Sequence, residues 1–376
     1  MMIGVGRSSW LRGFIEHMVV YSTSGATQRT ARPRYKIPKR QFLTRGIVSA
    51  MEHLPYMLVS ENLSATYNQD EVKCITKYFN VVTLTSIQEN KGLAEKVEAI
   101  GILCWELVVT KDLLDSLPNL RTVASFGAGV DHLDLPLLWS HGVSVSHTPD
   151  VVSATTADMG MALLLASARE VVNGAYLTKS PNYMDGGRIL VGVDVHGATL
   201  GILGMGRIGR LVAERAHGFH MSILYHNRTR RPIHEETALG AQYCQKIDEV
   251  LEKSDFLVIA VDANPGTVKI IGGRELKLMK TNATIINISR GIVIDQAALV
   301  KALQNKWIRA AALDVTDPEP LPRDHPLLQL PNVIVTPHIG ASTVHTRREM
   351  LQSVAANALA AVQGRPIPHE VKPHQG

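Results

Sequence analysis

A glycine fingerprint constrains this chain more than any other feature. The stretch 199–210 reads TLGILGMGRIGR, in which a short apolar run leads into Gly204, Gly206 and Gly209 at the spacing G-x-G-x-x-G. The apolar residues that follow Arg207 recur at helical spacing. A strand, a glycine turn and a helix in this order are the context in which such a fingerprint binds the pyrophosphate of a dinucleotide. We expect Gly204 to permit the tight turn, Gly206 to let the backbone approach the phosphates, and Gly209 to let the helix pack closely on the strand.

Apolar runs that alternate with helical or loop sequence predict a parallel sheet around the fingerprint. Six runs in the second half of the chain indicate its strands: 199–203, 222–225, 256–260, 283–287, 310–313 and 332–335. A doubly wound dinucleotide-binding fold has six parallel strands. We therefore assign residues 148–342 to a Rossmann dinucleotide-binding domain, in an α/β fold.

The segment 51–147 shows the same alternation and predicts a second, smaller α/β domain that would bind the substrate. A short helix is expected over 93–100, and a long one over 153–172 leads toward the fingerprint. A last helix, over 342–362, is expected to cross back, so that residues 343–368 would complete the smaller domain. The dinucleotide-binding domain would then be an insertion in the smaller one.

Residues 1–50 differ from the rest of the chain in composition. The first 45 hold nine Lys or Arg and one acidic residue, whereas the remainder holds 30 Lys or Arg and 33 Asp or Glu. The basic character therefore belongs to this extension, and it does not indicate nucleic-acid binding. Its composition fits a mitochondrial transit peptide. A disordered extension on a cytoplasmic protein is the favoured alternative, because the stretch shows no clear amphipathic helix. No apolar run approaches the ~18 residues that span a bilayer, and three scattered cysteines indicate a reducing compartment and no metal site.

The stretch 225–231, at the end of the second predicted strand of the Rossmann domain, reads YHNRTRR. NAD-preferring sites carry an acidic residue here, about 20 residues beyond the fingerprint, which binds the ribose hydroxyls. In this chain Asn227 replaces the acid, and Arg228, Thr229 and Arg230 follow. Arginines would attract a 2′-phosphate through charge-assisted hydrogen bonds, whereas a carboxylate would repel it. We therefore expect NADP to be preferred and NAD to be tolerated; the other interpretation is a solvated basic loop that does not touch the cofactor.

Charged and titratable residues follow three later strands of the same domain. They are Arg290 in SRG, Glu319 in a segment that begins at Asp314, and His338 in TPHIG. Because the carboxyl ends of parallel strands meet at one edge of a sheet, these side chains should face the cofactor. Arg290 would pair with the carboxylate of a 2-oxo acid and polarise its ketone, and His338 would protonate the developing alkoxide. Glu319 would orient His338 and favour its charged form, while Asp314 would hold the nicotinamide carboxamide.

The stretch GAGVD at 127–131 follows a predicted strand of the smaller domain. Ligands enter parallel sheets at this end of a strand, and exposed N–H groups in such a loop can hold a carboxylate. The simpler interpretation, a tight turn without a ligand, fits the local sequence equally well.

Taken in order, these motifs resemble the D-isomer-specific 2-hydroxyacid dehydrogenase family. The similar segments are GAGVDH at 127–132, TTAD at 155–158, GMGRIG at 204–209, SRG at 289–291, D-x-x-x-x-E at 314–319 and TPHIG at 336–340. The resemblance covers about residues 55–365 and is greatest to glyoxylate/hydroxypyruvate reductases and 2-ketogluconate reductases. It implies a Rossmann domain inserted in a smaller flavodoxin-like domain, and a homodimer built partly through the helix that begins near Ser153.

The resemblance also implies a set of site residues. Catalysis would use Arg290, Glu319 and His338, and the N–H groups of Ala128 and Gly129 would bind the substrate carboxylate beside Arg290 and His338. The cofactor-binding residues would be Gly204, Gly206, Arg207, Ile208, Gly209, Asn227, Arg228, Thr229, Arg230, Ile288, Asp314 and Gly340. The implied reaction is NADPH-dependent reduction of glyoxylate, hydroxypyruvate or 2-ketogluconate to a D-2-hydroxy acid, with no nucleic-acid or membrane partner.

Two features of the sequence leave alternatives open. Some hydroxypyruvate reductases place a tryptophan from the loop before the fingerprint in the partner's active site, but this chain has no Trp between Trp139 and Trp307, and Tyr183 is the nearest aromatic residue in that loop. Transcriptional corepressors share this fold and its three catalytic residues, so a dinucleotide-sensing interaction protein is the competing function. Those corepressors resemble NAD binders, and the arginines after Asn227 therefore favour the enzyme.

Overall fold

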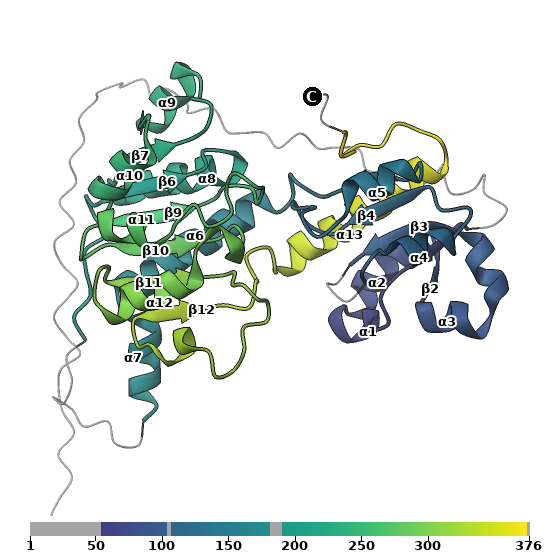
Figure 1. Cartoon of the computed structure of the whole chain (residues 1–376), viewed down its shortest axis with the longest axis horizontal. Helices are drawn as coiled ribbons and strands as arrows, with labels where there is room; N and C mark the ends of the chain where they lie inside the picture. Colours follow the sequence, from purple (N-terminus) through teal and green to yellow (C-terminus); the bar gives the residue numbers. More distant parts are fainter. Residues whose placement is uncertain (1–53, 104–106, 181–189, 374–376) are drawn as a thin grey trace, which may run out of the picture. The chain divides into compact units, whose positions relative to one another are not determined.

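The computed structural model describes residues 54–103, 107–180 and 190–373, which contain two parallel sheets covered by helices (Figure 1). The basic extension and Tyr183 lie outside the described residues, and the expectations for them stay predictions. Within the described ranges, no helix combines the length and the apolar composition that a membrane crossing requires.

The smaller sheet has five parallel strands in the order β2-β1-β3-β4-β5. The strands are β1 (Tyr56–Leu58), β2 (Asn80–Val82), β3 (Val97–Ile102), β4 (Thr122–Ser125) and β5 (Ser144–Ser146). The helices around it are α1 (Leu63–Thr66), α2 (Gln69–Thr76), α3 (Leu84–Glu89), α4 (Lys111–Asp115), α5 (Leu135–Ser140) and α13 (Val344–Val362). Although α13 comes last in the chain, it contacts α2, β3, β4 and β5. The strand order is that of flavodoxin-like sheets, which the resemblance implied.

One expectation for this sheet is wrong. The predicted helix over 93–100 is a 3-10 helix, η2 (Lys91–Lys96), followed at once by β3. Val97, Ala99 and Ile100 are fully buried. A strand that is buried on both faces reads as a continuous apolar run, and such a run has no period that distinguishes it from a buried helix.

The larger sheet has seven parallel strands in the order β12-β11-β10-β9-β6-β7-β8. The strands are β6 (Thr199–Leu203), β7 (Ser222–His226), β8 (Ala241–Tyr243), β9 (Phe256–Ile259), β10 (Thr284–Asn287), β11 (Ala310–Leu313) and β12 (Val333–Val335). The strand order reverses between β6 and β9, and ligands bind at such a switch point. All six predicted strands are present, and the sequence missed only β8, an edge strand of three residues that are half-buried or exposed.

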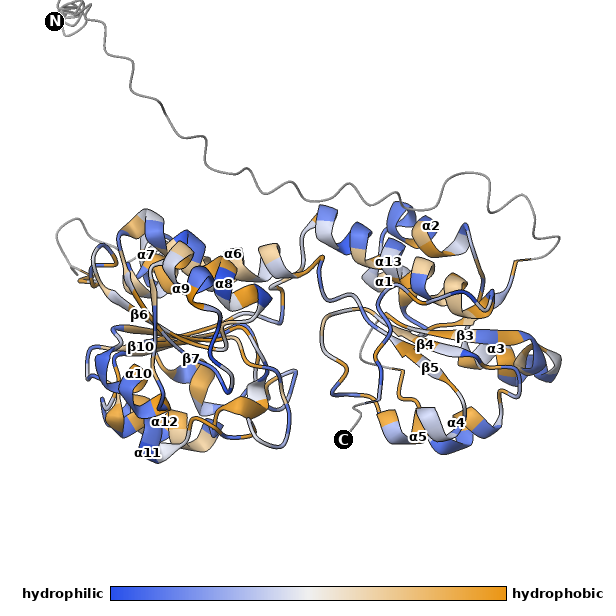
Figure 2. Ribbon diagram, turned by 90° about the horizontal axis from the view of Figure 1, so that it is seen from above, coloured by the Kyte–Doolittle hydropathy of each residue, from blue (hydrophilic) through white to orange (hydrophobic). Residues whose placement is uncertain are grey.

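Helices cover both faces of the larger sheet. Figure 2 shows α6 (Ser153–Ala168) and α8 (Arg207–Ala216) on one face and α10 (Ile247–Lys253), α11 (Gly273–Leu278) and α12 (Gln296–Gln304) on the other. Each face has its own cluster of buried apolar side chains. Leu200 and Ile202 of β6 are fully buried in the core between the sheet and α8, and burying a side chain of this size contributes roughly 1.5–3 kcal/mol. The fingerprint thus directly follows a strand that is anchored in the core.

The long helix expected over 153–172 is interrupted. α6 ends at Ala168, Glu170 adopts a left-handed conformation with φ 52°, and a separate helix, α7 (Val171–Thr178), follows. The carbonyl of Ala168 accepts a hydrogen bond from Val193 N–H at 2.8 Å, and it therefore does not continue the helical ladder. Gly192 makes this approach possible, because a Cβ there would lie 2.2 Å from the same carbonyl oxygen. A contact across such a sequence separation leaves no local signal in the apolar pattern.

Candidate active site

The glycine loop between β6 and α8 has the shape of a phosphate cradle. Gly204 has φ +97°, and a Cβ on it would lie 2.5 Å from the carbonyl oxygen of Ala260. A Cβ on Gly209 would lie 2.0 Å from the carbonyl oxygen of Gly204, so helix and turn are in backbone contact. Apart from its chain neighbours, a Cβ on Gly206 would meet no atom of the described residues within 4 Å. The loop is therefore closed on the protein side and open at the start of α8.

The first turn of α8 offers hydrogen-bond donors on that open side. Its N-cap residue is Gly206, and no side chain caps the helix. The first N–H groups of a helix have no acceptor within the helix, and they carry a partial positive charge. These N–H groups, which include those of Arg207 and Ile208, therefore fit the pyrophosphate of a dinucleotide.

Asn227 is oriented by the glycine loop. Its side-chain oxygen accepts a hydrogen bond of 2.6 Å from Met205 N–H, which fixes the amide group. The NH₂ group of Asn227 consequently remains as a donor at the end of β7, where the ribose is expected. A donor can bind either a 2′-hydroxyl or a 2′-phosphate, whereas a carboxylate would accept only from the hydroxyl.

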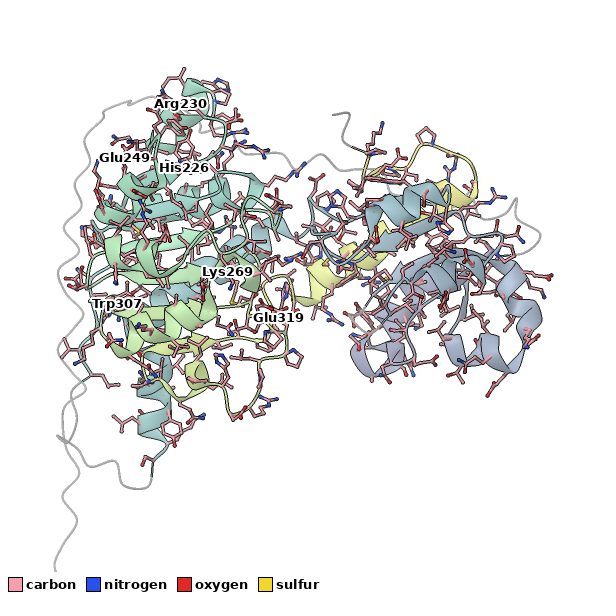
Figure 3. The ribbon with its side chains drawn as sticks, in the orientation of Figure 1. His226, Arg230, Glu249, Lys269, Trp307 and Glu319 are labelled. Carbon is pink, nitrogen blue, oxygen red and sulfur yellow. The ribbon has the colours of Figure 1, made fainter. Side chains whose placement is uncertain are left out.

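The arginines that follow Asn227 differ in their partners. Arg228 is exposed, and within the described residues it has no hydrogen bond or ion pair. Arg230, which is labelled in Figure 3, donates two hydrogen bonds to the buried carboxylate of Glu236, at 2.8 and 2.7 Å. Glu236 also accepts a hydrogen bond of 2.6 Å from the hydroxyl of Tyr225. Only the remaining N–H groups of Arg230 could bind a ligand, while the whole guanidinium of Arg228 could do so.

Hydrogen bonding and burial explain the pKa values of this cluster. The hydrogen bond from Arg230 lowers the pKa of Glu236 to about 2. Burial, with the hydrogen bond to Glu236, raises the pKa of Tyr225 to about 12. Glu236 is therefore charged and Tyr225 neutral across the physiological range, which keeps the base of the loop fixed.

Three other residues expected to bind the cofactor lie in different surroundings. Arg207, at the first position of α8, is exposed, and its Nε lies 3.1 Å from a carboxylate oxygen of Asp150. Ile288 is buried, and its side chain lies where a Cβ on Gly160 of α6 would come within 2.9 Å. Ile288 belongs to the core between the sheet and α6, so only its backbone could face a ligand. Thr229 is exposed beside Arg228.

Arg290 joins the carboxyl end of β10 to the loop after β4. Its Nε lies 3.1 and 3.2 Å from the two carboxylate oxygens of Asp131, and its Nη1 donates to Ser289 O at 3.0 Å. A Cβ on Gly129 would lie only 1.8 Å from Nη2 of Arg290. The guanidinium therefore sits directly against the loop 127–131, where the sequence predicted a carboxylate to bind. Ala128, in the same loop, accepts a hydrogen bond from the ring of His147 through its carbonyl at 2.7 Å.

Glu319 and His338 form an ion-pair geometry that fixes the imidazole. Nδ1 of His338 lies 2.9 Å from Oε2 of Glu319, and Oε1 of Glu319 accepts a hydrogen bond of 2.8 Å from Thr316 N–H. Since an ionised carboxylate only accepts, Nδ1 carries a hydrogen in this contact. Nε2 is then the nitrogen on the side away from Glu319, the position of a proton donor to a substrate. His338 itself has φ 52°, so its backbone is held in a conformation that few residues adopt.

Asp314 holds the loop that carries His338. Its carboxylate is buried and accepts three hydrogen bonds: from Thr336 Oγ1 at 2.6 Å, from Ile339 N at 2.9 Å and from Gly340 N at 2.7 Å. A Cβ on Gly340 would lie 2.8 Å from the same carboxylate. Asp314 and Gly340 thus fix the turn around His338, and binding of the nicotinamide carboxamide by Asp314 stays a prediction.

The structure brings Arg290, Glu319 and His338 to one edge of the larger sheet, as the strand ends predicted, and adds partners that the sequence reasoning missed. They are Asp131 of the loop motif, which pairs with Arg290, and Gln296, which forms hydrogen bonds with the main chain of Asp317. Neither has a local sequence signal, because each acts on a segment distant in the chain. Among the described residues, no group of three or more His, Cys, Asp or Glu could hold a metal ion.

Comparison with known proteins gives a consistent result. Residues 161–340 match the family model described as D-isomer specific 2-hydroxyacid dehydrogenase, NAD binding domain. The chain is 42% identical to a glyoxylate reductase of Thermococcus gammatolerans over 283 residues, which are 73% of this chain and 84% of that protein. It is also 42% identical to glyoxylate/hydroxypyruvate reductase B of Yersinia pestis over 285 residues, 75% of this chain and 86% of the relative.

Solved structures agree with the sequence comparisons. The fold is similar to that of an NADPH-dependent glyoxylate/hydroxypyruvate reductase from Sinorhizobium meliloti in complex with NADP and malonate, with a TM-score of 0.75 and 30% identity. The similarity covers 85% of this chain and 97% of that one.

Proposed function

Because this chain belongs to the D-isomer-specific 2-hydroxyacid dehydrogenase family and is an oxidoreductase, we propose that it reduces small 2-oxo acids such as glyoxylate, hydroxypyruvate or 2-ketogluconate with NADPH. One observation carries this proposal: Arg290, the loop 127–131 and the Glu319–His338 pair occur together with an open glycine cradle. The product would be a D-2-hydroxy acid, as the family description indicates.

Each catalytic residue has a role that follows from its contacts. Arg290 would bind the substrate carboxylate and polarise the ketone, together with the N–H groups of Ala128 and Gly129, because its guanidinium lies against their loop. His338 would donate a proton from Nε2 to the developing alkoxide, while Glu319 stabilises the imidazolium at Nδ1. The bound nicotinamide cofactor supplies the hydride.

The preference for NADP rests on Asn227 and Arg228. Asn227 presents a donor instead of a carboxylate, and Arg228 keeps all its donors available for a 2′-phosphate. Arg230 would assist through the N–H groups that Glu236 does not use. The solved relative from Sinorhizobium meliloti is described as NADPH-dependent, which supports the same preference here.

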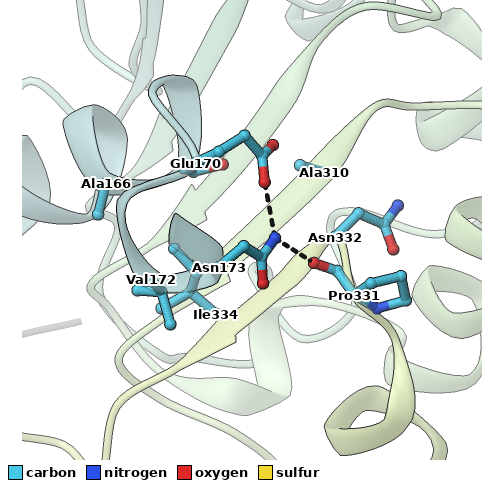
Figure 4. A pocket seen from close by; sticks show the side chains of 9 residues that line it. Ala166, Glu170, Val172, Asn173, Ala310, Pro331, Asn332 and Ile334 are labelled. Atoms are coloured by element: carbon cyan, nitrogen blue, oxygen red, sulfur yellow. Dashed lines mark hydrogen bonds between the residues drawn. The ribbon is translucent and has the colours of Figure 1, made fainter. Parts of the chain in front are cut away.

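The apolar surface of α7 supports the proposed homodimer. Val171, Val172 and Tyr176 are 55%, 49% and 81% exposed, an unusual set for one short helix. Asn173 links α7 to the segment before the edge strand β12 by donating a hydrogen bond to Pro331 O at 3.0 Å, and it also donates to Glu170 at 2.6 Å (Figure 4). The cavity beside it holds about 10 Å³, which is room for about one water and not for a ligand. Light scattering would measure the mass in solution, and Tyr176→Glu is expected to yield a monomer.

The competing function is that of a dinucleotide-sensing interaction protein. Such a protein would bind the cofactor without a need for turnover, so the catalytic residues alone do not exclude it. A reductase is favoured because such corepressors resemble NAD binders, whereas this chain has Asn227 and the exposed Arg228 in place of the acidic residue of an NAD site.

The decisive experiment measures NADPH and NADH oxidation at 340 nm with the three 2-oxo acids. We expect turnover with NADPH to exceed turnover with NADH, and His338→Gln to abolish it while NADPH still binds.

Asn227→Asp keeps the hydrogen bond from Met205 but adds a charge, so it should reverse the cofactor preference. Arg228→Gln should raise the KM for NADPH alone, and the exposed Arg365→Gln serves as the matched control. Tight cofactor binding without turnover of any of the three acids would favour the sensor.

A further inference from the structure

We propose that Gln296 is a positioning residue that holds Glu319 against His338. This inference rests on the reductase function proposed above. Gln296 begins α12 and contacts neither Glu319 nor His338 in the hydrogen bonds of the described residues. Its effect would reach them through the backbone of the segment 316–319.

Gln296 forms hydrogen bonds with both the N–H and the C=O of one residue, Asp317. Its Nε2 donates to Asp317 O at 2.7 Å, and its Oε1 accepts from Asp317 N–H at 3.2 Å. This reciprocal pair fixes the orientation of the amide, because a flipped amide would place oxygen against oxygen and nitrogen against nitrogen. Nε2 also lies 3.2 Å from Nε2 of His325, which packs on the same side chain. The main chain of Asp317 is thus held by a side chain with matching donor and acceptor.

The segment held by Gln296 is the one that orients Glu319. Asp317 is two residues before Glu319, and Thr316, its neighbour, donates its N–H to Oε1 of Glu319 at 2.8 Å. The hydroxyl of Thr316 donates to Pro318 O at 2.9 Å, which closes the turn. Because Oε1 is taken up by Thr316, Oε2 is the oxygen that faces Nδ1 of His338. The position of the Thr316–Asp317 peptide therefore decides where the carboxylate lies.

A second contact ties the same peptide to the segment of Arg290. A Cβ on Gly291 would lie 1.9 Å from Thr316 O and 2.5 Å from Asp317 N, so the two backbones touch. Gly291 directly follows Arg290, and Gln296 follows five residues later. Gln296 and Gly291 together keep the Arg290 segment and the Glu319 segment in a fixed relation, so that carboxylate binding and proton donation act on the same substrate.

Loss of the hydrogen bonds between Gln296 and Asp317 should lower the catalytic rate and leave the affinity for the cofactor unchanged. Glu319 and His338 have side chains that are 30% and 28% exposed, so packing alone does not fix them. A displacement of about 1 Å in a catalytic group can cost about 100-fold in rate, and partial loosening should cost about tenfold. Among the described residues, neither the glycine loop nor Asn227 shares a hydrogen bond or an ion pair with Gln296, and cofactor affinity should therefore stay unchanged.

The first test compares Gln296→Ala and Gln296→Leu with Gln304→Ala, an exposed glutamine at the other end of α12. Leucine keeps most of the side-chain volume but cannot form the hydrogen bonds, so this variant distinguishes the effect of the hydrogen bonds from that of packing. We expect kcat with glyoxylate to fall about tenfold in both Gln296 variants, with the dissociation constant of NADPH and the thermal midpoint close to wild type. In a Glu319→Gln background, the same substitutions should cost nothing further, because they act through Glu319. Unchanged kcat, or an equal loss in both backgrounds, overturns the proposal.

The second test does not require turnover and so stays informative if the proposed reductase function fails. The proton on Nδ1 of His338, bonded to a carboxylate, should give a downfield signal in the ¹H NMR spectrum of the NADPH complex, assigned by its absence in His338→Gln. The signal should weaken or move upfield in Gln296→Ala and persist in Gln304→Ala. A signal unchanged in Gln296→Ala overturns the proposal whatever the activities are. Absence of turnover in the wild type, with the expected NMR response, would refute the reductase function alone.

Discussion

Replacing Gly129 by alanine should disable the site through a single methyl group. The backbone of Gly129 does not have the positive φ that excludes side chains, and an alanine could therefore be accommodated by the chain itself. Its Cβ, however, would lie 1.8 Å from Nη2 and 2.9 Å from Cζ of Arg290, and 2.6 Å from Oδ1 of Asp131. Contacts below 3.0 Å are essentially never observed for a Cβ, so the guanidinium has to move by more than about 1 Å.

The size of the effect follows from that displacement. A shift of about 1 Å in a substrate-orienting group can cost about 100-fold in rate, which is about 2.7 kcal/mol of transition-state stabilisation. Because Arg290 would bind the carboxylate and polarise the ketone, both KM and kcat for the 2-oxo acid should change. Folding should be nearly unaffected, since Gly129 lies in a half-exposed loop.

The assay is steady-state reduction of glyoxylate and hydroxypyruvate by Gly129→Ala, with NADPH affinity measured separately by fluorescence. Gly218→Ala is the matched control, because a Cβ there meets nothing within 4 Å and its φ is not positive. We expect kcat/KM to fall about 100-fold with an unchanged dissociation constant for NADPH. A Gly129→Ala enzyme with wild-type kcat/KM would refute the placement of Arg290 against the substrate loop.

Three further predictions concern the cofactor and the pH dependence of stability. Gly206→Ala would place a methyl group only where the pyrophosphate is expected, so NADPH should bind at least about tenfold more weakly in a fluorescence titration while the thermal midpoint stays constant; full affinity would argue against the cradle. Burial lowers the pKa of His132 below its usual 6.5, so the unfolded state binds more protons, and the thermal midpoint should fall as the pH drops below about 6.5, less steeply in His132→Gln. The pKa of Glu236 is lowered to about 2 by Arg230, so this carboxylate contributes stability that is complete above about pH 4.5 and is lost as the pH falls toward 2. In urea unfolding, the free energy of unfolding of Glu236→Gln should therefore decrease less than that of the wild type over this pH range. The same pH dependence in both proteins would contradict this prediction.

Much of the candidate site was readable in the sequence because it lies where strands end. Parallel strands that are apolar throughout mark their own ends, and Arg290, Glu319 and His338 follow such ends in chain order. The prediction of a helix over 93–100 was wrong because the strand β3 there is buried on both faces. The apolar residues of such a strand do not alternate, so their pattern does not distinguish a strand from a buried helix. The sequence analysis missed the edge strand β8 for the opposite reason: its three residues are half-buried or exposed, so they form no apolar run.

The sequence by itself thus determined the doubly wound fold, the glycine fingerprint and the three catalytic candidates, because local hydrophobic periodicity and turn chemistry act over a few residues. Only the tertiary structure decided which groups these residues meet. The pairing of Arg290 with Asp131 joins segments 159 residues apart, and the grip of Gln296 on Asp317 joins segments 21 residues apart. Arg230 is bonded to Glu236 and Arg228 is not, and this difference likewise depends on where α9 (Ile233–Leu239) places Glu236. Hydrogen bonds and ion pairs of this kind depend on distances that packing fixes after the chain has folded, and no pattern of residue types along the chain encodes them.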